Sequence, residues 1–114
     1  MKRVQAAVCI LFSLSLLLPA NSSAETVNVT VQGVKKTELL HNIFASLKIM
    51  QQQNDNLSAG QIRRLHKQAP AQIKAALAPF GYYSVQIENN NGQGLLKKKD
   101  AIWQAEYTVA LGLP

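Results

Sequence analysis

At 114 residues the chain has room for one small domain and no more. Its single cysteine excludes an internal disulfide framework. Twelve basic side chains against six acidic ones give a formal net charge of +6, a mild excess.

The first 24 residues have the pattern of a secretory signal peptide. Lys2 and Arg3 precede an apolar run that ends at Pro19, and small residues then stand before Glu25, as at a cleavage site. An uncleaved membrane anchor is the alternative, but the run of about 15 residues is short for a bilayer span. We therefore predict a signal peptide over 1–24 and export to the periplasm.

Export narrows the range of partners and chemistry. Cys9 lies within the predicted signal peptide, so the remaining domain, 25–114, has no thiol. Without Lys2 and Arg3, ten basic residues remain against six acidic ones, an excess of four. This charge and the export together argue against nucleic acid, and leave an acidic protein or an anionic membrane surface possible.

The domain is predicted to begin with a strand and a helix. Val27, Val29 and Val31 alternate with polar residues, which indicates a strand with one face toward water, and Gly33 ends it. Thr37 is predicted to cap the first helix. The apolar stripe of this helix consists of Leu40, Ile43, Phe44, Leu47 and Met50.

A second helix is predicted to begin after Ser58. Its apolar residues keep one register across Pro70, which indicates one kinked helix or two collinear helices, and we favour the kink. These residues are Ile62, Leu65, Ala69, Ile73, Ala76 and Leu77, and Phe80 is expected on the same face. Pro79 is expected to push Ala78 out of the helical conformation, and Gly81 to close the helix in the left-handed one.

Two more strands are predicted after the helices. The second, from Tyr82 to Glu88, is predicted to turn Tyr83, Val85 and Ile87 to one side. Asn89 to Gly94 has the composition of a turn, and Lys97 to Asp100 is expected to continue an exposed hairpin end. The third strand is predicted to face the core with Trp103, Ala105, Tyr107 and Val109. The predicted fold is α+β, in the order β-α-α-β-β: a three-stranded mixed sheet covered on one face by two antiparallel helices.

The sequence has no clear arrangement of residues for catalysis. His41 and His66 lie on different predicted helices with no second ligand at metal spacing, and the six acidic residues are scattered singly. We therefore expect neither an enzyme nor a cofactor or metal site.

Two features remain as candidate binding surfaces. Lys97, Lys98 and Lys99 are predicted to form a solvated hairpin tip, and an anionic surface is the alternative contact. The second feature is main-chain: one strand of a three-stranded sheet must leave an edge that can accept a strand from another polypeptide.

The residues also resemble a known family. The features that carry the resemblance are the export signal, Val-x-Val-x-Val-x-Gly, Asn42-Ile43, Ala-Leu-x-Pro-Phe-Gly-Tyr-Tyr ending at Tyr83, and a closing aromatic strand that runs into Gly-x-Pro. They are similar to a POTRA (polypeptide-transport-associated) domain of the Omp85 family, most of all to the first POTRA domain of TamA-type proteins. The resemblance covers essentially all of 25–114.

The resemblance implies a periplasmic module that binds protein during outer-membrane protein assembly or autotransporter secretion. Its implied partners are a TamB-like protein or a nascent outer-membrane protein, and its third strand is implied to be central. The implied docking edge is the second strand, with residues Tyr82, Tyr83, Ser84, Val85, Gln86, Ile87 and Glu88. A small secreted inhibitor with a similar two-layer fold is the alternative function. Because the sequence stops where a second POTRA domain would begin, we expect a fragment or a single domain that only binds.

Overall fold

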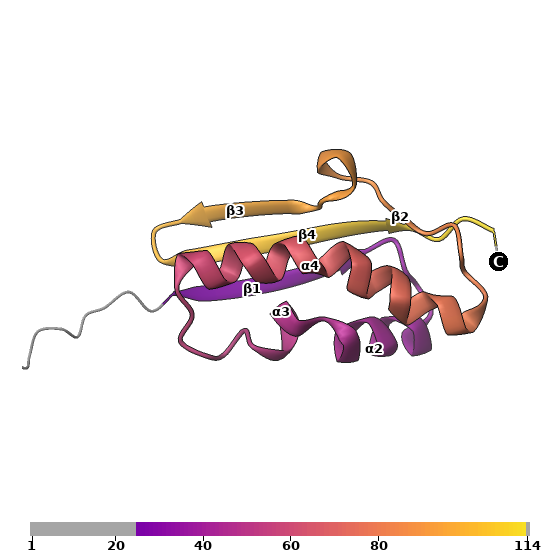
Figure 1. The fold of residues 1–114 in the computed structure, drawn as a ribbon, viewed down its shortest axis with the longest axis horizontal. Coiled ribbons are helices and arrows are strands. Elements are labelled where there is room, and N and C mark those ends of the chain that lie inside the picture. Colours follow the sequence, from indigo (N-terminus) through magenta and orange to yellow (C-terminus); the bar gives the residue numbers. More distant parts are fainter. Residues whose placement is uncertain (1–24, 114) are drawn as a thin grey trace, which may run out of the picture.

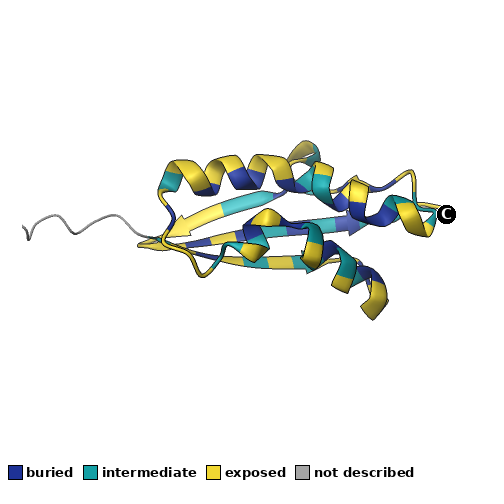
Figure 2. Cartoon of the chain, turned by 60° about the horizontal axis from the view of Figure 1, so that its bottom comes forward, coloured by how far each residue is buried: buried dark blue, intermediate teal, exposed yellow. Residues whose placement is uncertain are grey.

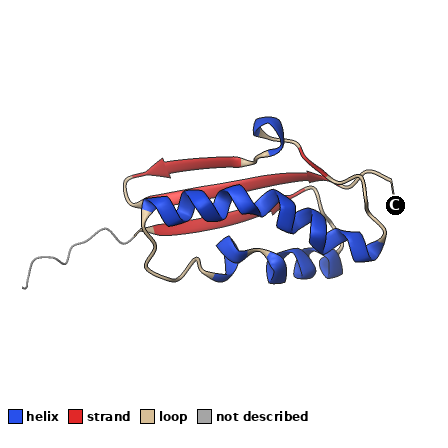
Figure 3. Ribbon diagram, viewed as in Figure 1, coloured by secondary structure: helices blue, strands red, loops and turns tan. Residues whose placement is uncertain are grey.

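The computed structural model describes residues 25–113, in which a layer of helices covers one face of a sheet (Figures 1 and 3). In chain order the elements are β1 (Thr26–Gln32), α2 (Thr37–Ser46), α3 (Lys48–Gln51), α4 (Ala59–Leu77), the 3₁₀ turn η2 (Ala78–Phe80), β2 (Gln86–Ile87), the 3₁₀ turn η3 (Asn90–Gly92), β3 (Leu95–Lys99) and β4 (Ile102–Ala110). The predicted α+β class is confirmed. The predicted signal peptide lies outside the described residues.

The sheet is mixed and is organised around β4. β1 runs parallel to β4, from Thr26 opposite Ile102 to Gln32 opposite Thr108. β2 and β3 both pair antiparallel with the other side of β4, β2 near its end and β3 along its first half. The third predicted strand is therefore central and the second lies at an edge, as the resemblance implied.

The sheet has four strands where three were predicted. Residues 97–100 are exposed as predicted, but the three lysines belong to β3 and pair with β4, so their assignment to the hairpin tip was wrong. Asp100, with a positive φ of 59°, lies in the actual turn. Lysine runs have little intrinsic preference for strands, so the partner strand determines this conformation.

The first predicted helix is divided. Leu47 adopts an extended conformation between α2 and α3, and the residue before α2 is Lys36, so the prediction of Thr37 as N-cap was wrong by one residue. α4 begins as predicted: Ser58 accepts a hydrogen bond from the Gln61 amide, and the Gln61 side chain accepts one from the Ser58 amide, a capping box.

α4 continues through Pro70 as one helix, which agrees with the favoured prediction. The end of α4 differs from the prediction at one position. Ala78 stays in the helical region and begins the 3₁₀ turn η2, with Pro79 tolerated in this short first turn. Gly81 then closes the turn with φ 92°, as expected.

The core lies between the sheet and the helices (Figure 2). The predicted inward set on β4 is confirmed, because Trp103, Ala105, Tyr107 and Val109 are all buried. Phe80 is 40% exposed, so its predicted place on the buried face of α4 was wrong: the 3₁₀ turn changes the rotation per residue just before it.

Candidate polypeptide-binding edges

The segment Tyr82–Glu88, predicted as the docking strand, has only two residues in the sheet. Gln86 pairs with Ala110 and Ile87 with Val109. Tyr82 packs against the core, whereas Tyr83 is 80% exposed, so the prediction that Tyr83 shares a face with Val85 and Ile87 was wrong. β2 is thus a short edge strand, and the residues before it, 82–85, are irregular.

A shallow groove accompanies this short strand. It has a volume of about 540 Å³ and lies between the last turns of α4 and the β2 edge, where Lys74, Gln86, Ile87, Glu88, Asn91 and Gly92 line it. One lysine and one glutamate give it charges of both signs. It could hold part of an extended chain, but only the two residues of β2, Gln86 and Ile87, form a regular strand beside it.

The edge beyond β2 is interrupted by a closed loop, Asn89–Gly94. The Asn89 side chain takes the place of missing strand backbone: its Oδ1 accepts from the Thr108 amide at 3.2 Å and its Nδ2 donates to Glu106 O at 3.4 Å. The Gly94 amide donates to Asn89 O at 3.0 Å and closes the loop. β2 and β3 are therefore two halves of one edge, separated by a bulge that satisfies the β4 backbone between them.

A buried polar pair links α4 to β4 beside this loop. His66 is 9% exposed, and its Nδ1 lies 2.7 Å from the Tyr107 hydroxyl. Burial lowers the pKa of His66, and a hydrogen bond to the Gly94 backbone opposes that effect. With its proton on Nε2, the neutral ring accepts at Nδ1 from the Tyr107 hydroxyl. Burial also raises the pKa of Tyr107.

Gly94 itself is required by this arrangement. With φ 80°, a Cβ added to it would lie 2.4 Å from the Tyr107 ring. The sequence assigned His66 only to a helix, and the partners are 41 residues apart. The one sequence signal for burial was the position of His66 beside Leu65 and Ala69 on the apolar face.

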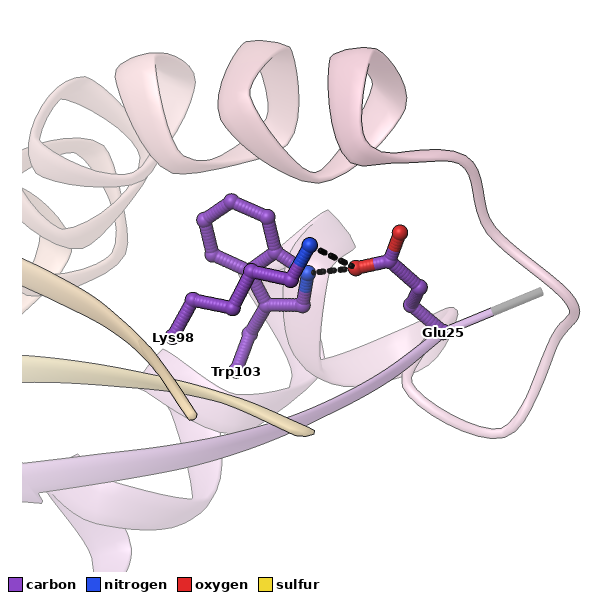
Figure 4. A network of polar contacts seen from close by, with 3 residues as sticks. All are labelled: Glu25, Lys98 and Trp103. Carbon is purple, nitrogen blue, oxygen red and sulfur yellow. Dashed lines mark hydrogen bonds and ion pairs between the residues drawn. The ribbon is translucent and has the colours of Figure 1, made fainter. Parts of the chain in front are cut away.

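The lysines of β3 differ in their surroundings. Lys98 reaches over the Trp103 ring, with Nζ 5.2 Å from the ring centre, and lies 3.3 Å from a Glu25 carboxylate oxygen (Figure 4). The same oxygen accepts a hydrogen bond from the indole N–H of Trp103. This hydrogen bond is the main cause that lowers the pKa of Glu25, and Lys98 lowers it further. Lys98 is thus ion-paired with Glu25, and its side chain remains 43% exposed.

Lys97 and Lys99 have a different position. They are exposed opposite Gln104 and Ile102, on the face of the sheet away from the helices, and line a shallow hollow there. Of the three predicted anionic contacts, these two point to solvent. Lysines on an edge strand also disfavour unwanted strand pairing along β3.

The described part of the chain gives no indication of other kinds of site. Between residues 25 and 113, no three side chains of the metal-binding types come together. Within the same range, every helix is too short or too polar to cross a membrane.

The parallel β1–β4 pair, the antiparallel strands on the other side of β4 and the helices on one face agree with the POTRA fold that the sequence resemblance implied. The family model described as POTRA domain TamA domain 1 matches residues 28–111, and the chain belongs to this family. Comparison with curated proteins gave no match, and comparison with solved structures gave none.

Proposed function

We propose that the chain is a periplasmic polypeptide-binding module that takes part in outer-membrane protein assembly or autotransporter secretion. The observation that carries the proposal is the family match over residues 28–111. POTRA domains generally bind proteins, and the sheet of this one offers main-chain groups at both of its edges. Its partner would be a TamB-like protein or an outer-membrane protein not yet folded.

The physical basis of binding would be strand addition. Main-chain hydrogen bonds supply affinity that depends little on the partner's sequence, and alternate side chains of the added strand supply selectivity. This suits a module that must accept different unfolded chains. No catalytic step is part of the proposal. The predicted periplasmic location rests on the proposed signal peptide.

Backbone-amide chemical-shift mapping of the ¹⁵N-labelled protein tests the proposal. We expect titration with an unfolded outer-membrane barrel protein, or with a TamB fragment, to shift amides along one sheet edge. An unfolded helical protein of similar length serves as the control. The proposal is wrong if neither the Tyr82–Glu88 segment nor β1 responds to either partner.

A further inference from the structure

Helix α4 has basic side chains and no acidic ones. Over its 19 residues it carries four lysines and arginines and neither aspartate nor glutamate. Three of the four, Arg63, Lys67 and Lys74, fall within about 40° of one another around the helix axis, at about 100° per residue. We call these three residues the basic stripe. Arg63 and Lys67 are one helical turn apart, and like charges at this spacing destabilise a helix unless an anion lies beside them.

The basic stripe faces the side of the domain on which β2 and β3 lie. Arg63 lies over the Trp103 ring, with its guanidinium carbon 5.9 Å from the ring centre. Lys67 and Gln93, a residue of the loop before β3, line a hollow of about 280 Å³. Lys74 lines the shallow groove beside β2. The stripe therefore follows the boundary between α4 and the segment that runs from β2 to β3.

The charges of the basic stripe are available to a ligand. All three residues are exposed, and within residues 25–113 none of their side chains forms an ion pair. Acidic residues approach the stripe only at its two ends, where Glu25 lies near Arg63 and Glu88 lines the groove with Lys74. No acidic residue lines the hollow beside Lys67. The middle of the stripe therefore has the least compensated charge.

The hollow in the middle of the stripe suits a carboxylate group. Lys67 offers an ammonium group and Gln93 an amide N–H, and both donate hydrogen bonds to an oxygen anion. Both residues are exposed, whereas His66, the third residue of the lining, is buried. The two donors therefore lie at the open side of the hollow, where the side chain of another polypeptide can reach them.

An acidic polypeptide fits the basic stripe better than a membrane surface does. The hollow and the groove lie between α4 and the β2–β3 segment, where a single chain can enter and the plane of a bilayer cannot follow. At a rise of 1.5 Å per residue, Arg63 and Lys74 are about 17 Å apart along the helix. An extended chain covers this length with about five or six residues. The stripe also leads into the groove beside β2, an edge at which the proposed function expects a polypeptide.

We propose that the basic stripe of α4, together with the hollow between Lys67 and Gln93, binds an acidic segment of about five or six residues in a partner polypeptide. One glutamate or aspartate side chain of the partner occupies the hollow, and further carboxylates pair with Arg63 and Lys74. The inference rests on the proposed function in taking the partner to be a polypeptide, and it requires no pairing with a sheet edge.

Fluorescence anisotropy of a labelled peptide tests this proposal. The probe is a peptide of alternating glutamate and serine, and the control peptide has glutamine in place of each glutamate. We expect the glutamate peptide to bind, with an affinity that falls as salt screens the charges, and the glutamine peptide not to bind. In ¹⁵N-labelled protein we expect the glutamate peptide to shift the side-chain amide signals of Gln93 and the backbone amide signal of Lys67, and to leave the amide of Lys48 on α3 unchanged.

Charge-matched variants separate the site from the net charge of the domain. We expect the double variant Lys67→Gln, Lys74→Gln to weaken binding of the glutamate peptide about tenfold, the effect of losing two exposed ion pairs. The matched control is the double variant Lys36→Gln, Lys48→Gln, which removes the same charge from exposed positions beside α2 and in α3. Equal losses in the two double variants would show that net charge alone attracts the peptide, and would overturn the proposal.

Three further results would overturn the proposal. Equal affinity for the glutamine peptide would show that the stripe does not select carboxylates. Shifts of the Gln93 signals with phosphatidylglycerol vesicles, but not with the glutamate peptide, would assign the stripe to a membrane surface and leave the proposed function standing. Absence of peptide binding would remove the stripe as a site. It would overturn the proposed function only if an unfolded barrel protein and a TamB fragment also failed to shift the amides of either sheet edge.

Discussion

Replacing Tyr107 with phenylalanine removes the hydroxyl that forms a hydrogen bond with Nδ1 of His66. The hydroxyl lies 2.7 Å from this nitrogen, Tyr107 is fully buried and His66 is 9% exposed. A buried donor or acceptor left without a partner costs about 1–3 kcal/mol of stability. We therefore expect Tyr107→Phe to lower the free energy of unfolding by that amount, although the side chain keeps almost its full volume.

The double-mutant cycle separates the hydrogen bond from packing. His66→Leu alone leaves the Tyr107 hydroxyl unpaired, and the double variant removes both polar groups. Since replacing both partners of a hydrogen bond costs less than stranding one, the double variant should lose at least about 1 kcal/mol less than the sum of the single losses.

Urea unfolding at about pH 8 measures the cycle, since an unperturbed histidine is neutral there. Trp103 is the single tryptophan of the chain and is 7% exposed, so its fluorescence reports unfolding. Losses that add to within about 0.5 kcal/mol would refute the reasoning, because they would show that the two groups are energetically independent.

Three further predictions concern the same domain. Burial lowers the pKa of His66, so below about pH 6.5 the unfolded chain binds more protons than the folded one. The free energy of unfolding should therefore decrease as the pH falls from there. In urea titrations, His66→Gln should abolish this dependence on pH. The pKa of Glu25 is lowered from 4.5, so its stabilisation should be present above that pH and disappear as the pH falls through the folded-state value; Glu25→Gln should remove this acid-dependent loss of the thermal unfolding midpoint. Gly94→Ala should destabilise by about 2–3 kcal/mol, because it combines a positive φ with overlap of the Tyr107 ring, whereas Gly60→Ala, where nothing lies within 4 Å, should be neutral or stabilising by up to about 1 kcal/mol. Equal effects of the two alanines in urea unfolding would contradict the packing argument.

Features with a strong local signal could be predicted from the sequence. The valines of β1 and the inward set of β4 repeat every second residue, and Ser58 is a preferred cap residue before an apolar periodic stretch; the structure has all three. The periodicity of the sequence could not predict one of the strands, β3. Lys97–Lys99 forms a strand because β4 provides main-chain partners for it, which no local pattern indicates.

The candidate site was harder to predict than the fold. Whether an edge is open depends on what lies beside it, and Asn89 closes part of the β2 side with its own side chain. The burial of His66 was also hidden, because its hydrogen-bond partner Tyr107 lies 41 residues further along the chain. Contacts between distant residues decide both points, and a single sequence does not contain them.

The most direct test of the proposed strand addition is a set of isotope-filtered nuclear Overhauser measurements on the ¹⁵N-labelled protein bound to an unlabelled peptide of alternating valine and threonine. Strand addition predicts cross-peaks between the amide protons of one sheet edge, β1 or β2, and the backbone protons of the peptide. A bound peptide whose backbone protons give no cross-peaks to either edge would contradict it.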